Sequence, residues 1–165
     1  MISDDPTSTS DGRTDPLWLS VIQYIRRGWC PIPIPYGSKA PRWPEWQKLR
    51  PDTVDLAKLF PDVRMNVGIS LGAASGGLVD LDLDCQEARA SAKHLALPTH
   101  CVWGRASASD SHRLYIVADP PDQAAMPWGD PVRTGKGSRL LEIRSTKGQT
   151  VCPPSLVPGD RKSVV

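Results

Sequence analysis

The sequence has 165 residues, 20 of them Lys or Arg and 18 of them Asp or Glu, which gives a formal net charge of +2. This length suits one domain with its own core, and so balanced a charge gives no signal of its own for a nucleic acid or a membrane as partner. Four scattered cysteines form no C-x-x-C pair, and no apolar run suits a signal peptide or a membrane span, so we expect a cytoplasmic chain with free thiols, no zinc site and no membrane partner.

The first half of the chain predicts one amphipathic helix followed by extended and looping segments. Asp15 and Pro16 are typical of a helix start, and Gly28 is typical of the residue after a helix end. The apolar stripe between them should pack on a sheet. Asp52 or Thr53 should cap a second, short helix. In chain order, the expected elements are a disordered tail, a helix, an extended proline-rich segment, a loop and the short helix: 1–14, 15–27, 29–36, 37–46 and 53–60.

The second half predicts a series of strands with one helix among them. We expect two strands, 66–71 and 78–84, followed by a helix over 86–96. A pair of short strands, 101–103 and 113–117, should enclose a polar loop over 104–111. A proline-rich excursion over 119–130 and a final strand pair, 139–143 and 149–152, should complete the chain. The helix should carry Ala88, Ala92 and Leu95 on one side. Because strands and helices do not alternate regularly, this order indicates an α+β domain with a largely antiparallel sheet and helices on one face.

The segment from Gly76 to Asp84 alternates apolar and acidic residues with the period of a strand. Asp80, Asp82 and Asp84 should share one face with Leu78, while the other face is apolar. Like charges this close repel, so the row needs a positive partner, and carboxylate oxygens suit Mg²⁺ or Mn²⁺. The alternative is an edge strand whose solvated acidic face discourages aggregation.

Two further segments place polar residues on predicted strands. His112 opens an apolar strand, and Glu142 and Arg144 lie two residues apart on one face of a later strand. Taken alone, His112 is an ordinary surface or core histidine, and Glu142 with Arg144 is an ion pair of little energy. Together with the acidic strand, they supply what metal-assisted phosphoryl transfer needs, because carboxylates can hold two cations while His112, Arg144 or Lys39 neutralises phosphate oxygens.

The order and spacing of short motifs along the chain carry a resemblance to a known family. The motifs are, in order, Gly28-Trp29, Lys39-x-Pro41, Trp46, Asn66-Val67-Gly68-Ile69, Gly72, Gly77, Asp82-x-Asp84, His112, Glu142-Ile143-Arg144 and Val151-Cys152-Pro153-Pro154-Ser155. From about Leu17 to Pro158, the chain resembles the bifunctional DNA primase–polymerase domain of the archaeo-eukaryotic primase superfamily, which occurs in plasmids, phages and integrated elements. The motifs are specific in combination and not singly.

The resemblance implies a fold and a set of site residues. Asp82, Asp84 and Glu142 match the catalytic acids that hold two divalent cations, Mg²⁺ or Mn²⁺, and His112 matches the histidine that contacts the phosphates of the incoming nucleotide. The other positions implied in nucleotide binding are Ser111, Arg144 and Lys39. The family fold has a sheet related to the RNA-recognition fold, with an N-terminal α/β unit packed beside it. The cleft between the two holds nucleotide and template.

The chain departs from the family pattern around the histidine and the acids. Many members approach the histidine through two glycines, whereas here Asp110 precedes His112 by two residues, so Asp110 either points away or weakens this motif. Glu142 stands where Asp is common. Asp80 is an extra acid, which lies behind the metal ligands or, in an alternative register, replaces Asp84 as the partner of Asp82.

We therefore expect a metal-dependent nucleotidyltransferase that joins nucleoside triphosphates on single-stranded DNA during replication of a plasmid, phage or mobile element. The main alternative is a non-catalytic module that binds nucleotide or single-stranded DNA, and a weaker one is a metal-dependent phosphodiesterase. The catalytic domain should span 15–159. Residues 160–165 resemble a translated sequencing adapter, so we expect a non-native tail and a native chain that continues past Gly159, with a helicase attached or separate.

Overall fold

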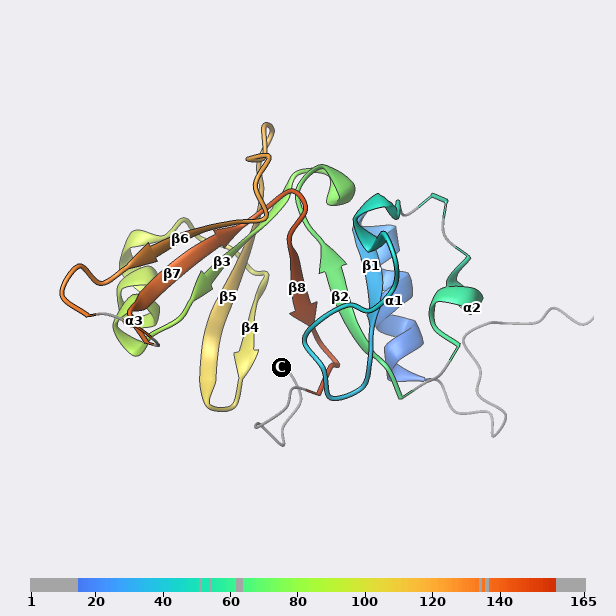
Figure 1. Ribbon diagram of the computed structural model, residues 1–165, viewed down its shortest axis with the longest axis horizontal. Helices are drawn as coiled ribbons and strands as arrows, with labels where there is room; N and C mark the ends of the chain where they lie inside the picture. Colours follow the sequence, from blue (N-terminus) through green and yellow to red (C-terminus); the bar gives the residue numbers. More distant parts are fainter. Residues whose placement is uncertain are drawn as a thin grey trace, which may run out of the picture.

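The fold consists of two antiparallel β-sheets that stand side by side, each with a helix packed on it (Figure 1). It is known from a computed structural model that describes residues 15–50, 52, 53, 55–61, 64–133, 135 and 137–156. The predicted disordered tail and the predicted non-native tail lie outside these residues: 1–14 and 160–165. The strands are β1 (Cys30–Ile34), β2 (Asn66–Ser70), β3 (Leu78–Leu83), β4 (Val102–Arg105), β5 (Ala108–Ile116), β6 (Ala125–Gly129), β7 (Arg139–Arg144) and β8 (Gln149–Cys152). The helices are α1 (Pro16–Arg26), α2 (Leu56–Leu59) and α3 (Gln86–Leu95), with single 3₁₀ turns η1 (Trp46–Lys48) and η2 (Ala73–Ser75).

The smaller sheet has the strand order β1-β2-β8 and carries α1 on one face. Asp15 caps α1, with its carboxylate accepting a hydrogen bond from Leu17 N at 3.0 Å, and Pro16 occupies the first helical position. The buried stripe of the helix includes Val21, which is fully inaccessible. The predicted start and packing face of this helix are therefore confirmed.

The larger sheet has the strand order β4-β5-β3-β7-β6, so the acidic strand β3 is its central strand. Helix α3 packs against β3, β5 and β7. Asp80 is 0% exposed and Asp82 is 7% exposed, so these acids face the interior of the protein. The alternative of a solvated edge strand is therefore wrong, while the predicted α+β class with mostly antiparallel sheets is confirmed.

Several boundaries predicted from the sequence are wrong for identifiable reasons. The cap of α2 is Asp55, whose carboxylate accepts from Ala57 N at 3.1 Å, so neither Asp52 nor Thr53 is the cap. Residues 104–111, predicted as a polar loop, belong mostly to the β4–β5 hairpin. A register shift between Trp103 and Arg105 interrupts the alternation of apolar and polar residues that would mark these strands in the sequence.

Two further predictions fail because tertiary context decides them. The segment 119–130 contains the edge strand β6, which tolerates Pro127 because an edge strand has a free side. The expected final strand pair does not form, since β7 joins the larger sheet and β8 joins the smaller one.

One hydrophobic cluster and two chain crossings connect the sheets. The cluster includes Val21 from α1, Ile69 from β2 and Leu114 from β5. The crossing from β7 to β8 is a tight turn in which Gly148 N donates to Ser145 O at 2.8 Å, and Leu71 N donates to Gly148 O at 3.0 Å. None of the helices in the described part of the chain is long and apolar enough to pass through a membrane.

The other crossing enters β3 through two glycines with different surroundings, which makes a matched test. Gly77 has φ +88°, and a Cβ added there would collide with the carbonyl oxygen of Val117, whereas Gly76 has φ +63° and open space around it. Gly76→Ala should lower the free energy of unfolding by about 1–2 kcal/mol, because alanine is strained in the left-handed backbone. Gly77→Ala should lower the free energy of unfolding by about 1–3 kcal/mol more than Gly76→Ala does, because the backbone must also move to relieve the collision. Urea unfolding followed by tryptophan fluorescence measures both, and equal losses would contradict this account of the crossing.

Candidate active site

The register of the larger sheet brings the predicted acids and histidine together. Asp82, near the end of β3, is directly opposite His112 on β5 and directly opposite Glu142 on β7. Directly opposite residues point to the same face, with their Cβ atoms about 4.5–5.5 Å apart. Side chains from three separate stretches of sequence are therefore neighbours, with Asp82 in the middle.

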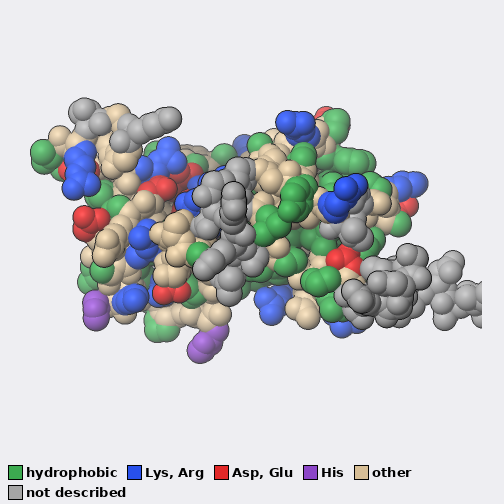
Figure 2. Space-filling view, turned by 90° about the horizontal axis from the view of Figure 1, so that it is seen from below, with side chains coloured by type: hydrophobic (Ala, Val, Ile, Leu, Met, Phe, Trp, Pro, Cys, Tyr) green, Lys and Arg blue, Asp and Glu red, His purple; other side chains and the backbone are tan. Residues whose placement is uncertain are grey.

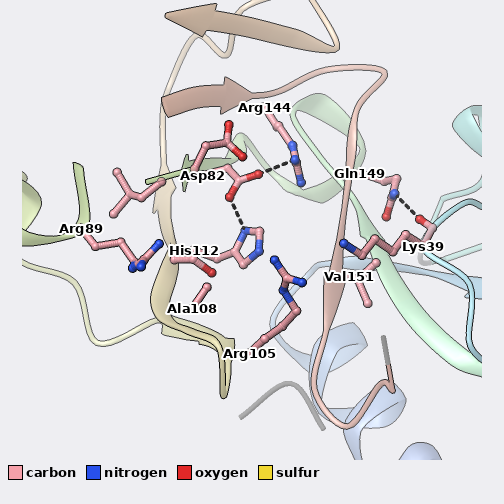
Figure 3. A pocket seen from close by; sticks show the side chains of 12 residues that line it. Lys39, Asp82, Arg89, Arg105, Ala108, His112, Arg144, Gln149 and Val151 are labelled. Carbon is pink, nitrogen blue, oxygen red and sulfur yellow. Dashed lines mark hydrogen bonds and ion pairs between the residues drawn. The ribbon is translucent and has the colours of Figure 1, made fainter. Parts of the chain in front are cut away.

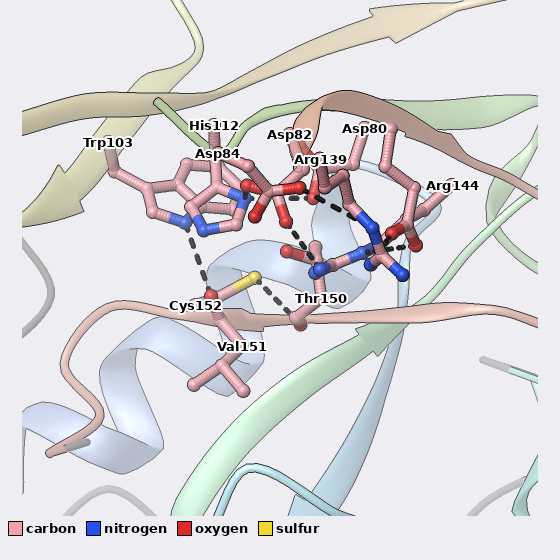
Figure 4. A network of polar contacts seen from close by, with 11 residues as sticks. Asp80, Asp82, Asp84, Trp103, His112, Arg139, Arg144, Thr150, Val151 and Cys152 are labelled. Carbon is pink, nitrogen blue, oxygen red and sulfur yellow. Dashed lines mark hydrogen bonds and ion pairs between the residues drawn. The ribbon is translucent and has the colours of Figure 1, made fainter. Parts of the chain in front are cut away.

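Two arginines of β7 contact these acids (Figure 4). Arg144 makes an ion pair with Asp82 and a second one with Glu142, for which the distance from Nε to Oε1 is 3.2 Å. Arg139 pairs with the other oxygen of Glu142, and its Nε lies 3.8 Å from Oδ2 of Asp84. Each of the three predicted metal ligands thus has a guanidinium beside it.

The ring of His112 is held by acids on one side and by an aromatic ring on another. Its Nδ1 lies 3.0 Å from Oδ2 of Asp80 and 3.6 Å from Oδ1 of Asp82. Trp103 on β4 stacks on the imidazole, with ring centroids 6.0 Å apart. Burial lowers the pKa of His112, but the carboxylates of Asp80 and Asp82 outweigh burial and raise this pKa above its ordinary 6.5.

A pocket of about 280 Å³ lies between this face of the larger sheet and the strand β8 (Figure 3). Its lining residues are Lys39, Asp82, Leu83, Asp84, Arg89, Arg105, Ala108, Ser111, His112, Arg144, Gln149 and Val151. The smaller sheet contributes through Gln149, whose Nε2 donates to Lys39 O at 2.9 Å and so ties the Lys39 loop to β8. The pocket is therefore a joint product of the two sheets.

The pocket carries cations that have no ion-pair partner among the described residues, namely Lys39, Arg89 and Arg105. Burial lowers the pKa of Lys39, and the nearby Arg105 and Arg144 lower it further, although acids across the pocket oppose them. On the face seen in Figure 2, basic and acidic side chains are intermixed over the half of the molecule that holds the larger sheet. An anionic ligand in the pocket would relieve this crowding of positive charge.

The predicted metal ligands have suitable chemistry but are engaged with arginines. Carboxylate oxygens on adjacent strands suit Mg²⁺ or Mn²⁺, and burial raises the pKa of Asp82 even though His112 and Arg144 oppose the shift. Because burial makes the ionised form of this carboxyl costly, a cation at close range would stabilise that form. Within the described ranges, however, no three Asp, Glu, His or Cys side chains are placed to hold a metal ion. The donor set fits a divalent cation, and filling the site requires an exchange of arginine for metal.

In the structure, every site residue predicted from the sequence except Glu142 lines this pocket. Glu142 is paired with Arg144, which does line it. Sequence reasoning therefore found most of the charged residues that line the pocket. It missed Arg89 and Arg105. Arg89 lies in the first half of α3, and Arg105 ends β4, two residues past the strand predicted at 101–103 and inside the segment interpreted as a loop. A helical-wheel view of α3 and a hairpin interpretation of the β4–β5 segment are the signals that could have found them.

Comparison with known proteins agrees with the motif order. A family model described as "Bifunctional DNA primase/polymerase, N-terminal" matches residues 21–165. A search among curated proteins gave no match.

The arginine pairs predict a competition with metal that can be measured directly. Arg139 is half-exposed, so it can leave Glu142 and Asp84 more readily than Arg144, which is more deeply placed. Because an exposed ion pair is worth up to about 1 kcal/mol, Arg139→Gln should tighten Mn²⁺ binding by about threefold to fivefold in calorimetric titrations.

The matched control is Arg133→Gln, which removes the same charge from the β6–β7 connection, where Arg133 pairs with Asp130 at 3.4 Å. This variant should leave Mn²⁺ affinity unchanged, because its partner belongs to no predicted ligand set. Weaker Mn²⁺ binding in Arg139→Gln would show that Arg139 aligns the acids and does not compete for them.

Proposed function

This chain belongs to the bifunctional DNA primase/polymerase family, and from that premise we propose that it joins nucleoside triphosphates on a single-stranded DNA template. One observation carries the proposal beyond the family match. Asp82 lies directly opposite both Glu142 and His112, at the wall of a pocket that also contains cations without ion-pair partners in the described chain. Carboxylates for metal beside cations for phosphate are the two requirements of nucleotidyl transfer.

The acidic side of the pocket would hold the divalent cations. Asp82 and Glu142 are cross-strand neighbours, and Asp84 follows directly after the end of β3, so the three ligands come from two adjacent inner strands of the sheet and the end of one of them. When bound there, two Mg²⁺ or Mn²⁺ ions would supply charge neutralisation for the 3′-hydroxyl and the leaving pyrophosphate. Arg144 lines the same pocket and contacts Asp82 and Glu142, so it would share these carboxylates with the cations or give up a contact to them.

The basic side of the pocket would bind the triphosphate. When both ring nitrogens carry protons, the form that the raised pKa favours, His112 donates to Asp80 from Nδ1 and can donate to a phosphate from Nε2. Lys39 and Arg105 face the same space (Figure 3). Charge-assisted hydrogen bonds of this type are about twice as strong as neutral ones. Ser111 also lines the pocket, which supports its predicted part in nucleotide binding.

The departure at Asp110 does not count against the proposal. Asp110 is exposed, has φ 56°, and is absent from the residues that line the pocket. Within β5, two residues before the histidine, Asp110 has the left-handed backbone that glycine adopts most easily.

The proposed activity also fits a wider context. The same proposal gives the domain the span 15–159 and a place in replication of a plasmid, phage or mobile element, in the cytoplasm where such DNA lies. A helicase, either as a later part of the chain or as a separate protein, would supply the single-stranded template.

Loss of the acids should abolish synthesis without unfolding the protein. Asp82→Asn with Asp84→Asn should lower template-dependent extension by about a thousandfold, since each removes a charged contact to the reaction. Unfolding should not become easier, because a neutral amide at buried position 82 is less costly to desolvate than a carboxylate. Asp119→Asn, on the exposed surface, is the control for one lost charge. Full extension of the primed template by the double variant would contradict the assignment of Asp82 and Asp84 to the catalytic site.

A binding module that makes no bonds is the second candidate, and the arginine pairs favour it. In this arrangement Arg139 and Arg144 already neutralise the acids, and a non-catalytic descendant would need no metal. A domain of this kind would bind a nucleotide through Lys39, Arg105 and His112 alone.

Titration with a fluorescent dNTP, with and without Mn²⁺, separates the two candidates. The polymerase should bind the dNTP at least about tenfold tighter with Mn²⁺ and extend a primed template, because metal bridges protein and triphosphate. The binding module should show equal affinity in both conditions and no extension. Breakdown of the nucleotide or the template would point instead to a phosphodiesterase.

A further inference from the structure

Asp80 is a buried carboxylate that the proposed chemistry does not use. It is 0% exposed at the centre of β3, where its cross-strand neighbours are Leu114 and Arg144. Its Oδ2 is 3.0 Å from Nδ1 of His112, whereas its Oδ1 has no hydrogen-bond partner in the described part of the chain. An apolar residue would fit this position at much lower cost in desolvation, so the acid needs a reason to be there.

The reason lies in the two acids that compete for one ring nitrogen. Nδ1 of His112 is 3.0 Å from Oδ2 of Asp80. It is 3.6 Å from Oδ1 of Asp82, a predicted metal ligand, so this second acid is close enough to compete for the same nitrogen. A hydrogen bond from one ring nitrogen to a carboxylate fixes both the tautomer and the orientation of a histidine. By taking Nδ1, Asp80 leaves Oδ1 of Asp82 to a cation, while Oδ2 of Asp82 is paired with Arg144.

The same contact determines what the rest of the ring presents. With Nδ1 engaged, only Nε2 is available for a ligand, and Figures 3 and 4 show the second ring nitrogen turned away from the acids, toward the space beside β8. Trp103 limits rotation of the ring by stacking on it, and is itself fixed because its Nε1 donates to Val151 O at 3.2 Å. The imidazole is therefore held at its edge by an acid and on its face by an indole.

We propose that Asp80 is a positioning residue, which holds His112 so that Nε2 faces the phosphates of a nucleoside triphosphate while Oδ1 of Asp82 stays available to metal. This role rests on the proposed function of the pocket. It assigns to Asp80 neither a metal nor a substrate contact, and it distinguishes Asp80 from Asp82 although the two acids share a face of one strand.

Two variants of Asp80 separate orientation from packing. Asp80→Asn keeps an oxygen that accepts from Nδ1–H, so the affinity for a fluorescently labelled dATP with Mn²⁺ should fall by no more than about threefold, within about 0.7 kcal/mol. Asp80→Val keeps a well-packed core but removes the acceptor, so the affinity should fall by about tenfold, or about 1.4 kcal/mol. Thermal unfolding should show both variants folded, because neither buries an unpaired charge.

A double-mutant cycle with His112→Ala tests whether Asp80 acts through the imidazole. In the His112→Ala background, Asp80→Val should cause no further loss of dATP affinity, because the group it positions is gone. The same loss in both backgrounds, or no loss in either, would overturn the positioning role. Substitution of Val for Asp80 should also release the ring restraint, which turnover experiments would register as a rise in KM for dATP larger than the fall in kcat.

Nitrogen-15 NMR of the histidine rings, recorded without nucleotide or metal, keeps failure of this inference distinct from failure of the proposed function. In the wild-type protein, the His112 ring should show a hydrogen-bonded Nδ1–H that Asp80→Asn retains and Asp80→Val loses. An unchanged ring signal in Asp80→Val overturns the inference, whatever the protein binds. A ring signal that changes as expected, in a wild-type protein that does not bind labelled dATP, upholds the Asp80–His112 contact and overturns both the nucleotide site and the role toward phosphate.

Discussion

Repulsion among acids on one face of the larger sheet is the constraint on which the rest of the structure depends. Asp80, Asp82 and Glu142 are buried there with few water molecules to screen them, so each requires a cationic partner close by. The fold supplies these partners from the strands on either side, through the imidazole of β5 and the guanidinium groups of β7. The central position of β3 makes this possible, because only a central strand has neighbours on both sides.

The pocket depends equally on the docking of the two sheets. The larger sheet brings the acids, while the smaller one brings the far wall through β8 and the Lys39 loop tied to it by Gln149. Hydrophobic residues of both sheets belong to one buried cluster, so neither wall can shift without disturbing the core. The charged cleft is thus supported by apolar packing behind it, and polar residues alone would not hold it open.

Local sequence patterns were sufficient to predict individual elements of the fold, but not the pairing of strands that are distant in the sequence. The period of two along β3 and the cap at Asp15 act over a few residues, and both predictions agree with the structure. The register that sets Glu142 opposite Asp82 depends on contacts between distant strands, so the sequence suggested it only through the family motif order. The sequence around Arg139 does not show that its side chain pairs with Glu142, because that contact exists only in the folded sheet. The division of β7 and β8 between two sheets was equally invisible, since each has an ordinary strand pattern.

The tight turn between β7 and β8 has a consequence for how a ligand reaches the pocket. Ser145 and Gly148 are hydrogen-bonded to each other, Ser145 N donates to Ala124 O at 3.2 Å, and Gly148 O accepts from the smaller sheet. These hydrogen bonds hold the junction from both sheets, so it resists a change in the gap between the two walls of the pocket. Long side chains at the rim, such as Lys39 and Arg105, are then the parts of the pocket that can adjust most easily to a ligand. Selectivity for one sugar or base over another would accordingly be open to change by single replacements at that rim, without any redesign of the scaffold.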